Sequence, residues 1–234
     1  MVLVVFERGP GMTGGQAALP RPRAIVFDWD NTLVDSWQTI HGALVTTFEA
    51  MGHEPWTLEE TRARVRTSLR DGFPGLFAER WEEAAKVFYA AYEAVHLERL
   101  TPLPGAATLL EALAGRGDLH LAVVSNKRGK ILRLEAGHLR WDRHFRALVG
   151  AGDAARDKPA PDPLALALLD GAVPAGPDVW YVGDADIDME FACRTGCTPV
   201  LLSPAPVAEG QFGSYAPAAT FGGCEALAAY IDRL

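Results

Sequence analysis

The stretch Ala24-Ile25-Val26-Phe27-Asp28-Trp29-Asp30-Asn31-Thr32-Leu33-Val34-Asp35 decides the fold of this chain. Four apolar residues that lead directly into acids are typical of a buried central strand in a parallel sheet. Asp28 and Asp30 are two residues apart, so in an extended segment both side chains leave the backbone on the same side. Two such carboxylates repel each other unless a cation or a shared proton compensates, whereas a plain acidic turn would need neither. This stretch alone leaves both interpretations open.

Composition indicates one large domain, or one domain with an insertion, in a chain of 234 residues of which 49% are hydrophobic. The net charge of −8 disfavours nucleic acid or an anionic membrane as a partner. No segment is long and apolar enough for a membrane helix, and the start lacks the basic leader of a signal peptide. Three cysteines cannot form a disulfide framework, so free thiols and a cytoplasmic location are expected. The six histidines are scattered singly, which argues against a His-ligated metal site.

The first part of the chain divides into an arm, a strand and a helical insert. Residues 1–22 are expected to form a flexible N-terminal arm rich in Gly and Pro, and Met1 and Met12 both remain open as the start. Residues 36–100 show helical patterns and no strand pattern. Helices are predicted at 36–51, from the capping box Thr57 to Glu60 towards residue 69, and at 81–100, with a turn at 71–75. These helices predict an inserted helical subdomain.

The remainder of the chain alternates between strand and helix patterns. Strands are expected at 119–124, 147–149, 178–182 and 199–202, and helices at 106–114, 128–139, 163–169, 187–195 and 224–233. Repeated strand–helix units predict an α/β fold with a doubly wound parallel sheet, formed by residues 23–35 and 101–234. Ligands of such sheets bind beyond the carboxyl ends of the strands. Three predicted strand ends carry polar residues, at 28–32, at 125–126 and at 184–188.

Four ordered motifs resemble those of the haloacid dehalogenase-like superfamily of phosphatases. They are Asp28-x-Asp30-x-Thr32, then Ser125, then Lys158 within Asp157-Lys158-Pro159-Ala160-Pro161, and last Gly183-Asp184-x-x-x-Asp188. The helical insert after the first motif resembles the first type of cap in this superfamily. Leu103-Pro104-Gly105 before a helix resembles the phosphoglycolate phosphatase branch. The resemblance implies a Rossmann-like core with a helical cap inserted after the first motif.

The resemblance also implies a reaction. It is that of a Mg2+-dependent phosphatase, which hydrolyses a small phosphorylated metabolite through an aspartyl-phosphate. Asp28 would be the nucleophile, and Asp30 would protonate the leaving alcohol and then activate water. Mg2+ prefers carboxylate and water oxygens, and the ligands implied are Asp28, the backbone carbonyl of Asp30, Asp184 and Asp188.

Further residues would hold the phosphoryl group. Ser125 would donate a hydrogen bond to it, and Lys158 would neutralise its charge and keep the nucleophile ionised. Thr32 would steady the first loop or contact phosphate, and contact between Asn126 and the substrate remains open. Taken singly, Ser125-Asn126 also suits a helix cap, and Lys158 suits a solvated loop.

Two departures from the superfamily pattern are visible. Asn31 stands where glycine is commonest, although Asn tolerates a left-handed backbone better than most residues. Ala185 stands where a hydroxyl residue is frequent. Neither departure removes a catalytic group, but both weaken the assignment of a substrate by analogy.

Members of the superfamily with other functions differ in the residue at the position of Asp30 and in the cap. Asp30 disfavours a dehalogenase, which needs no proton for its leaving group, and it also disfavours a non-catalytic module that senses a phosphorylated ligand. A β-phosphoglucomutase-like sugar-phosphate mutase shares the core motifs and remains the main enzymatic alternative. The sequence leaves the substrate and the oligomeric state open.

An arginine cluster in the insert offers candidates for substrate contact. Arg62, Arg64, Arg66 and Arg70 alternate with apolar residues, which favours one solvated helix face. We nevertheless predict that a loop at residues 67–77, with Arg66 and Arg70 nearby, meets the leaving group. A small carboxylated substrate such as 2-phosphoglycolate would need one of these two arginines as its partner.

Overall fold

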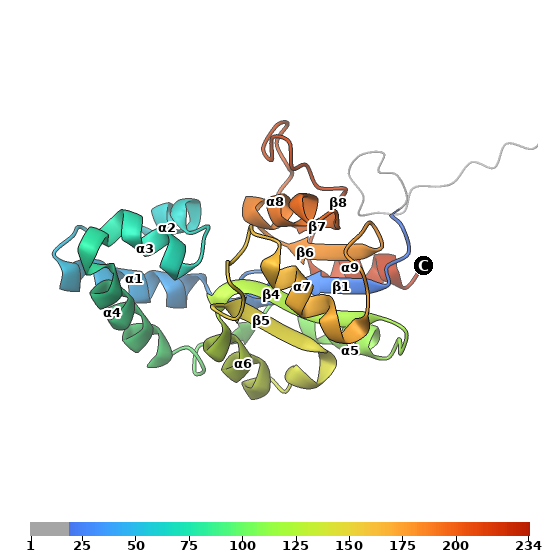
Figure 1. Ribbon diagram of the computed structural model, residues 1–234, viewed down its shortest axis with the longest axis horizontal. Coiled ribbons are helices and arrows are strands. Elements are labelled where there is room, and N and C mark those ends of the chain that lie inside the picture. Colours follow the sequence, from blue (N-terminus) through green and yellow to red (C-terminus); the bar gives the residue numbers. More distant parts are fainter. Residues whose placement is uncertain (1–18) are drawn as a thin grey trace, which may run out of the picture.

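A six-stranded parallel sheet forms the centre of the molecule (Figure 1). The computed structural model describes residues 19–234, so most of the predicted N-terminal arm lies outside the described residues. The strands follow the order β5-β4-β1-β6-β7-β8, and each pairing is parallel. Their bounds are β1 Ala24–Phe27, β4 His120–Arg128, β5 Ala147–Ala151, β6 Val179–Gly183, β7 Thr198–Leu202 and β8 Ala219–Phe221. The predicted doubly wound α/β class is confirmed.

Helices cover both faces of the sheet because its central strand is apolar on both sides. Ile25 and Phe27 pack towards α5 (Ala106–Ala114), α6 (Gly129–His138) and α9 (Cys224–Ile231). Ala24 and Val26 pack on the opposite face, towards α7 (Asp162–Leu168) and α8 (Asp186–Arg194). All four β1 side chains are fully buried. Strand β1 therefore lies at the centre of the core, as its continuous apolar run predicts.

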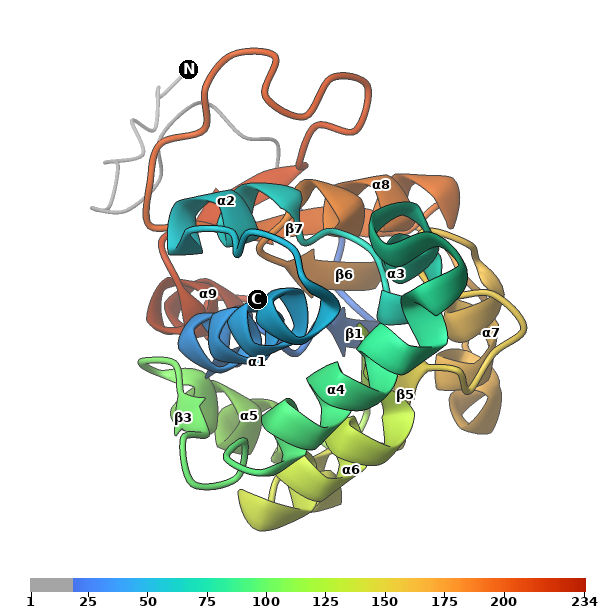
Figure 2. The same ribbon diagram turned by 90° about the vertical axis from the view of Figure 1, so that its left-hand side faces the viewer.

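The helical insert forms a separate lobe beside the sheet (Figures 1 and 2). It contains α1 (Trp37–Met51), α2 (Leu58–Arg64), α3 (Leu69–Phe77) and α4 (Trp81–Glu93). We call it the cap. The two-residue strands β2 (Val34–Asp35) and β3 (Thr101–Pro102) pair antiparallel where the chain enters and leaves it. The cap has its own apolar cluster, in which Phe48, Phe73 and Phe88 are buried.

The cap also contains the main differences from the predicted elements. The predicted turn at 71–75 lies inside α3, because burial of Phe73 and Phe77 outweighs the poor helix propensity of glycine and proline. Helix α4 ends at Glu93 rather than near residue 100, and the short strands β2, β3 and β8 were not predicted. The capping box forms as predicted: Glu60 N donates to Thr57 Oγ1 over 3.1 Å, and Thr57 N donates to Glu60 Oε2 over 2.9 Å.

Within residues 19–234, no helix combines the length and the apolar character that a membrane crossing requires.

Candidate active site

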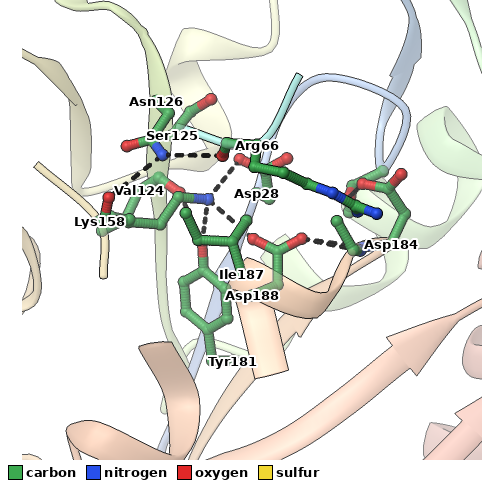
Figure 3. Close-up of polar contacts among 12 residues, drawn as sticks. Asp28, Arg66, Val124, Ser125, Asn126, Lys158, Tyr181, Asp184, Ile187 and Asp188 are labelled. Atoms are coloured by element: carbon green, nitrogen blue, oxygen red, sulfur yellow. Dashed lines mark hydrogen bonds and ion pairs between the residues drawn. The ribbon is translucent and has the colours of Figure 1, made fainter. Parts of the chain in front are cut away.

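The carboxyl ends of three adjacent strands bring the predicted site residues together. Strand β1 is hydrogen-bonded to β4 on one side and to β6 on the other. Asp28 follows β1, Ser125 lies near the end of β4, and Asp184 follows β6, so the three residues meet at one edge of the sheet. Figure 3 shows these side chains converging with those of Lys158 and Asp188. A cavity of about 190 Å³ lies between this edge and the cap.

Three carboxylates form a compact cluster at this edge. Asp28, Asp184 and Asp188 each offer an oxygen, and these oxygens lie within 4.8 Å of one another. Asp188 is held by the backbone: its Oδ2 accepts from the N–H of Asp184 (3.2 Å) and of Ala185 (3.0 Å). A Cβ at Gly183 would collide with the Asp188 side chain, so glycine is required at the end of β6. Clustered carboxylate oxygens are the donor set that hard divalent cations prefer, and the cluster is compatible with such an ion.

Burial makes it energetically unfavourable for the three carboxylates to be ionised together without a cation. It raises the pKa of the Asp28 carboxyl to about 6, against the opposing influence of Lys158. Burial, and next the charge of Asp188, raise the pKa of Asp184 well above its ordinary value. A divalent cation would relieve the repulsion that remains among the three carboxylates.

Lys158 provides the positive charge inside the cluster. Its side chain is 2% exposed, and its Nζ donates to Asp28 Oδ1, Asp188 Oδ1 and the Tyr181 hydroxyl, each over 2.8 Å (Figure 3). Burial opposes the charge on Lys158, but Asp188 and Asp28 raise its pKa well above the ordinary value. Tyr181, which sequence reasoning assigned only to a strand, donates in turn to the carbonyl of Val124 over 2.7 Å. Lys158 therefore stays charged and directly contacts the predicted nucleophile.

Asp30 contacts a second buried lysine, Lys127. Lys127 Nζ lies 2.7 Å from Asp30 Oδ1 and 2.7 Å from Glu135 Oε2. Glu135 is fully buried in α6, and burial alone would raise its pKa, yet Lys127 and its other donors hold that pKa below the ordinary value. The sequence could have indicated that Glu135 is buried, since it lies on the apolar side of a helix, beside Ile131 and Leu132.

Two residues predicted to bind phosphate form hydrogen bonds with other groups of the protein. The Thr32 hydroxyl is buried and donates to Asp184 Oδ1 over 3.1 Å, and Thr32 does not line the cavity. Asn126 lines the cavity, but its Nδ2 donates to the carbonyls of Arg66 (3.4 Å) and Lys158 (3.3 Å). Thr32 thus ties the first loop to the metal-ligand candidate Asp184, and Asn126 joins two loops.

The two cap arginines predicted to meet the substrate both form ion pairs with the core, and Arg66 also lines the cavity. Arg66 Nη1 lies 2.8 Å from Asp186 Oδ1 at the start of α8. Arg70 is bidentate to the buried Asp157, with Nε donating to Oδ2 over 2.6 Å, and Arg70 does not line the cavity. Arg70 is therefore misplaced in the prediction, because Asp157 occupies its guanidinium. The four arginines do not share one helix, since α2 ends at Arg64, but all four are exposed, as predicted.

Arg128 is a cavity residue that sequence reasoning missed. Its guanidinium carbon lies 4.8 Å from the ring centroid of Tyr89, and both residues line the cavity. Within residues 19–234, Arg128 forms no ion pair with a carboxylate, whereas Arg66, Lys127 and Lys158 all do. The apolar cap side chains Trp37, Ile40 and Trp56 complete the wall opposite the carboxylates.

The first loop takes the backbone shape that its sequence suggested. Asn31 has φ of 61°, the left-handed conformation that was expected to be tolerable for Asn. Its Oδ1 accepts from the backbone N–H of Ser36 over 3.2 Å, which ties the loop to the start of α1. The Ser36 hydroxyl itself makes no cap bond.

Fold and site together place clustered carboxylates and a buried lysine at the carboxyl edge of a parallel sheet, beneath a helical cap. The chain belongs to the haloacid dehalogenase-like hydrolase family, whose model matches residues 25–202. The predicted resemblance is confirmed, and with it the prediction of a hydrolase.

Individual relatives and structures agree with this assignment. The chain is 30% identical over 181 residues to a phosphoglycolate phosphatase of Aquifex aeolicus, which covers 76% of this chain and 84% of that protein. It is 31% identical over 180 residues to a phosphoglycolate phosphatase of Xylella fastidiosa, with coverage of 75% and 77%. The crystal structure of a hydrolase from Pseudomonas syringae matches 90% of this chain and 98% of its own, with a TM-score of 0.77. At 23% identity, that structure supports the fold alone.

Proposed function

We propose that the protein is a Mg2+-dependent phosphatase that hydrolyses a small phosphomonoester through an aspartyl-phosphate on Asp28. The observation that carries the proposal is the contact between Lys158 Nζ and Asp28 Oδ1, 2.8 Å apart, beside the carboxylates of Asp184 and Asp188. A buried carboxylate that must attack a phosphate dianion needs such neighbouring positive charge. The relatives named as phosphoglycolate phosphatases support this class of reaction.

The metal would be held by oxygen ligands only. Asp28, Asp184 and Asp188 would supply carboxylates, and the backbone carbonyl of Asp30 would supply a fourth oxygen. When bound, Mg2+ would neutralise the charge that the nucleophile and the phosphate dianion bring together. The raised pKa values of Asp28 and Asp184 support a cation at this point.

The side chains would divide the chemistry between them. A carboxylate oxygen of Asp28 attacks phosphorus, the ester P–O bond breaks, and Asp30 gives its proton to the leaving alcohol. Burial raises the pKa of Asp30 against the opposing effect of Lys127, which favours a proton on Asp30 before this step. Asp30 then takes a proton from water, whose oxygen attacks the aspartyl-phosphate and releases inorganic phosphate. Ser125, which lines the cavity, and Lys158 would hold the phosphoryl oxygens.

The substrate we favour is a small phosphorylated metabolite with an anionic group, as in 2-phosphoglycolate. A cavity of about 190 Å³ suits a small molecule. Arg128 is the cavity cation available to a substrate carboxylate, and we assign it the role first expected of Arg66 or Arg70. We place the protein in the cytoplasm, because Cys193, Cys197 and Cys224 are all free.

The test is a screen of the purified protein with Mg2+ against a panel of phosphometabolites, measuring the inorganic phosphate released. We expect Mg2+-dependent release from at least one small phosphomonoester, with 2-phosphoglycolate among the best, and loss of release in EDTA. Interconversion of isomeric sugar phosphates, with little phosphate released, would instead favour the mutase alternative. Tight binding of a phosphate ester without turnover would favour a non-catalytic module.

A further inference from the structure

A buried polar network lies behind the acid Asp30, and the chemistry described above leaves it unused. At its centre is Glu135, which is fully buried and whose carboxylate accepts from four donors. These are Trp29 Nε1 (2.7 Å), Lys127 Nζ (2.7 Å), His96 Nδ1 (2.9 Å) and the Tyr92 hydroxyl (3.1 Å). Lys127 Nζ also donates to the Tyr92 hydroxyl over 2.7 Å and lies 2.7 Å from Asp30 Oδ1.

Fold stability gives little reason for this arrangement. Buried ion pairs can often be replaced by apolar side chains of similar size without loss of stability, because desolvation of the charges is expensive. The apolar cluster of the core already surrounds Trp29 and the neighbouring α6 residue Leu132. A functional reason is suggested by what Glu135 contacts, since Trp29 is the residue between Asp28 and Asp30 in the first loop.

The network reaches the first loop by two routes. Through Trp29, Glu135 anchors the loop that carries the nucleophile and the acid. Through Lys127, it reaches the carboxyl group of Asp30 itself, because one ammonium bridges the two carboxylates. A lysine side chain has many rotamers, and Glu135 and Tyr92 together confine this one to a single position.

We propose that Lys127 is a positioning residue that fixes the Asp30 carboxyl group for proton exchange with the leaving oxygen, and that Glu135 and Tyr92 hold Lys127 in place. General acids work only within hydrogen-bond reach of the atom they protonate. Contact with Lys127 restrains one oxygen of Asp30, and Asp30 lines the cavity, so its carboxyl group is presented there in a defined orientation. This proposal rests on the proposed phosphatase function.

The same network connects the acid to the cap. Tyr92 belongs to cap helix α4 and His96 follows it, whereas Lys127 and Glu135 belong to the core. Because Tyr92 contacts both Lys127 and Glu135, the support of Lys127 is complete only when α4 is docked on the core. Asp30 is thereby positioned when the cap covers the cavity and excludes water.

The leaving group provides the test. The variant is Lys127→Met, and the matched control is Lys130→Met, which makes the same substitution at an exposed lysine at the start of α6. The measured quantity is kcat/KM with Mg2+ for p-nitrophenyl phosphate, phenyl phosphate and 2-phosphoglycolate. Nitrophenolate leaves readily without a proton, whereas the alkoxide of 2-phosphoglycolate needs one. Because general acid catalysis contributes roughly 10²–10⁴-fold, we expect Lys127→Met to lower kcat/KM for 2-phosphoglycolate by about 100-fold or more.

For Lys127→Met, we expect the loss in kcat/KM to increase from p-nitrophenyl phosphate through phenyl phosphate to 2-phosphoglycolate. For p-nitrophenyl phosphate we expect a change of only a few fold, with phenyl phosphate intermediate. Lys130→Met should match the wild type on all three substrates. Equal losses on all three substrates for Lys127→Met would overturn the proposal, because a purely structural defect does not distinguish leaving groups.

Milder variants keep the test informative if Lys127→Met does not fold. Tyr92→Phe removes one hydroxyl and Glu135→Gln one charge, and both should reproduce the leaving-group dependence in weaker form. Uniform losses in these variants would again overturn the proposal. Failure of the phosphatase function is distinguishable, because it would leave the wild-type protein inactive towards all three esters.

Discussion

Substitution of Lys158 by methionine should destabilise the metal-free protein more than the Mg2+-bound protein. Lys158 donates three hydrogen bonds of 2.8 Å at a side chain only 2% exposed. Methionine conserves most of the volume but leaves Asp28 and Asp188 buried without their cation. Removing one partner of a buried ion pair costs about 3–5 kcal/mol. Because the pKa of Asp28 is already raised to about 6, protonation can relieve part of the cost, and we expect about 3 kcal/mol.

Bound Mg2+ should reduce the difference in the free energy of unfolding between Lys158→Met and the wild type. Without Lys158, the carboxylate cluster carries one more uncompensated charge, so the folded variant should bind Mg2+ more tightly than the wild type does. Each tenfold gain in affinity adds about 1.4 kcal/mol of stability at saturating metal. The variant should therefore recover at least about 1 kcal/mol relative to the wild type on going from EDTA to saturating Mg2+.

Urea unfolding followed by circular dichroism, in EDTA and in saturating Mg2+, measures the destabilisation of the variant without and with the metal. Lys130→Met is the control, because its lysine is exposed, and it should leave the free energy of unfolding nearly unchanged in both conditions. If Lys158→Met is destabilised equally with and without Mg2+, the reasoning is refuted. Lys158 and a bound cation would then not neutralise the same carboxylates.

Further predictions concern the metal, the cavity and the first loop. Burial raises the pKa of Asp28 to about 6 and that of Asp184 well above its ordinary value, so acid pH leaves these ligands protonated. Mg2+ needs the ionised carboxylates, and its affinity, measured by calorimetry, should therefore rise from pH 5 to pH 7.5 with release of protons; an affinity independent of pH would contradict this. Arg128→Ala should raise KM for 2-phosphoglycolate more than for p-nitrophenyl phosphate in steady-state assays, whereas Arg70→Ala, which loosens the cap, should affect both alike. Equal effects of Arg128→Ala on the two substrates would remove its role as the carboxylate partner. Asn31→Gly and Asn31→Val both lose the hydrogen bond from Ser36 N–H, but only valine is also strained at a φ of 61°, so valine should be less stable than glycine by about 1–2 kcal/mol in thermal unfolding. Equal stability of the two variants would show that the left-handed conformation is not required.

The site residues at strand ends could be predicted because two simple patterns coincide there. An apolar run marks a buried strand, and the polar residue after it marks the carboxyl edge where ligands bind. Asp28, Ser125 and Asp184 satisfy both patterns, and the parallel order β4-β1-β6 brings them together. Lys158 lies in a loop between β5 and α7, so no periodic pattern identifies it. Its prediction depended on the family motif.

Residues that act through contacts between cap and core escaped prediction for a physical reason. Arg70 was predicted to meet the leaving group, but it is paired with Asp157, which is 87 positions away in the sequence. Glu135 and Tyr92 are likewise 43 positions apart. Local periodicity contains no information on how the cap is oriented on the core, and that orientation decides whether a cap arginine meets the substrate or a buried aspartate.

The same limit explains the misplaced turn in the cap. Gly72 and Pro74 have poor intrinsic helix propensity, which favoured a turn at 71–75. Burial of Phe73 and Phe77 in the cap cluster instead stabilises α3 through tertiary contacts. Propensity is a weak guide wherever aromatic side chains find a buried partner.

The most direct test of the central claim is the Mg2+-dependent turnover of p-nitrophenyl phosphate by Asp28→Asn. Asparagine has nearly the size of aspartate but lacks the carboxylate nucleophile. We predict that turnover falls to the level of the enzyme-free reaction while the circular dichroism spectrum and the cooperative unfolding transition are retained. Substantial Mg2+-dependent turnover by a correctly folded Asp28→Asn protein would contradict the aspartyl-phosphate mechanism.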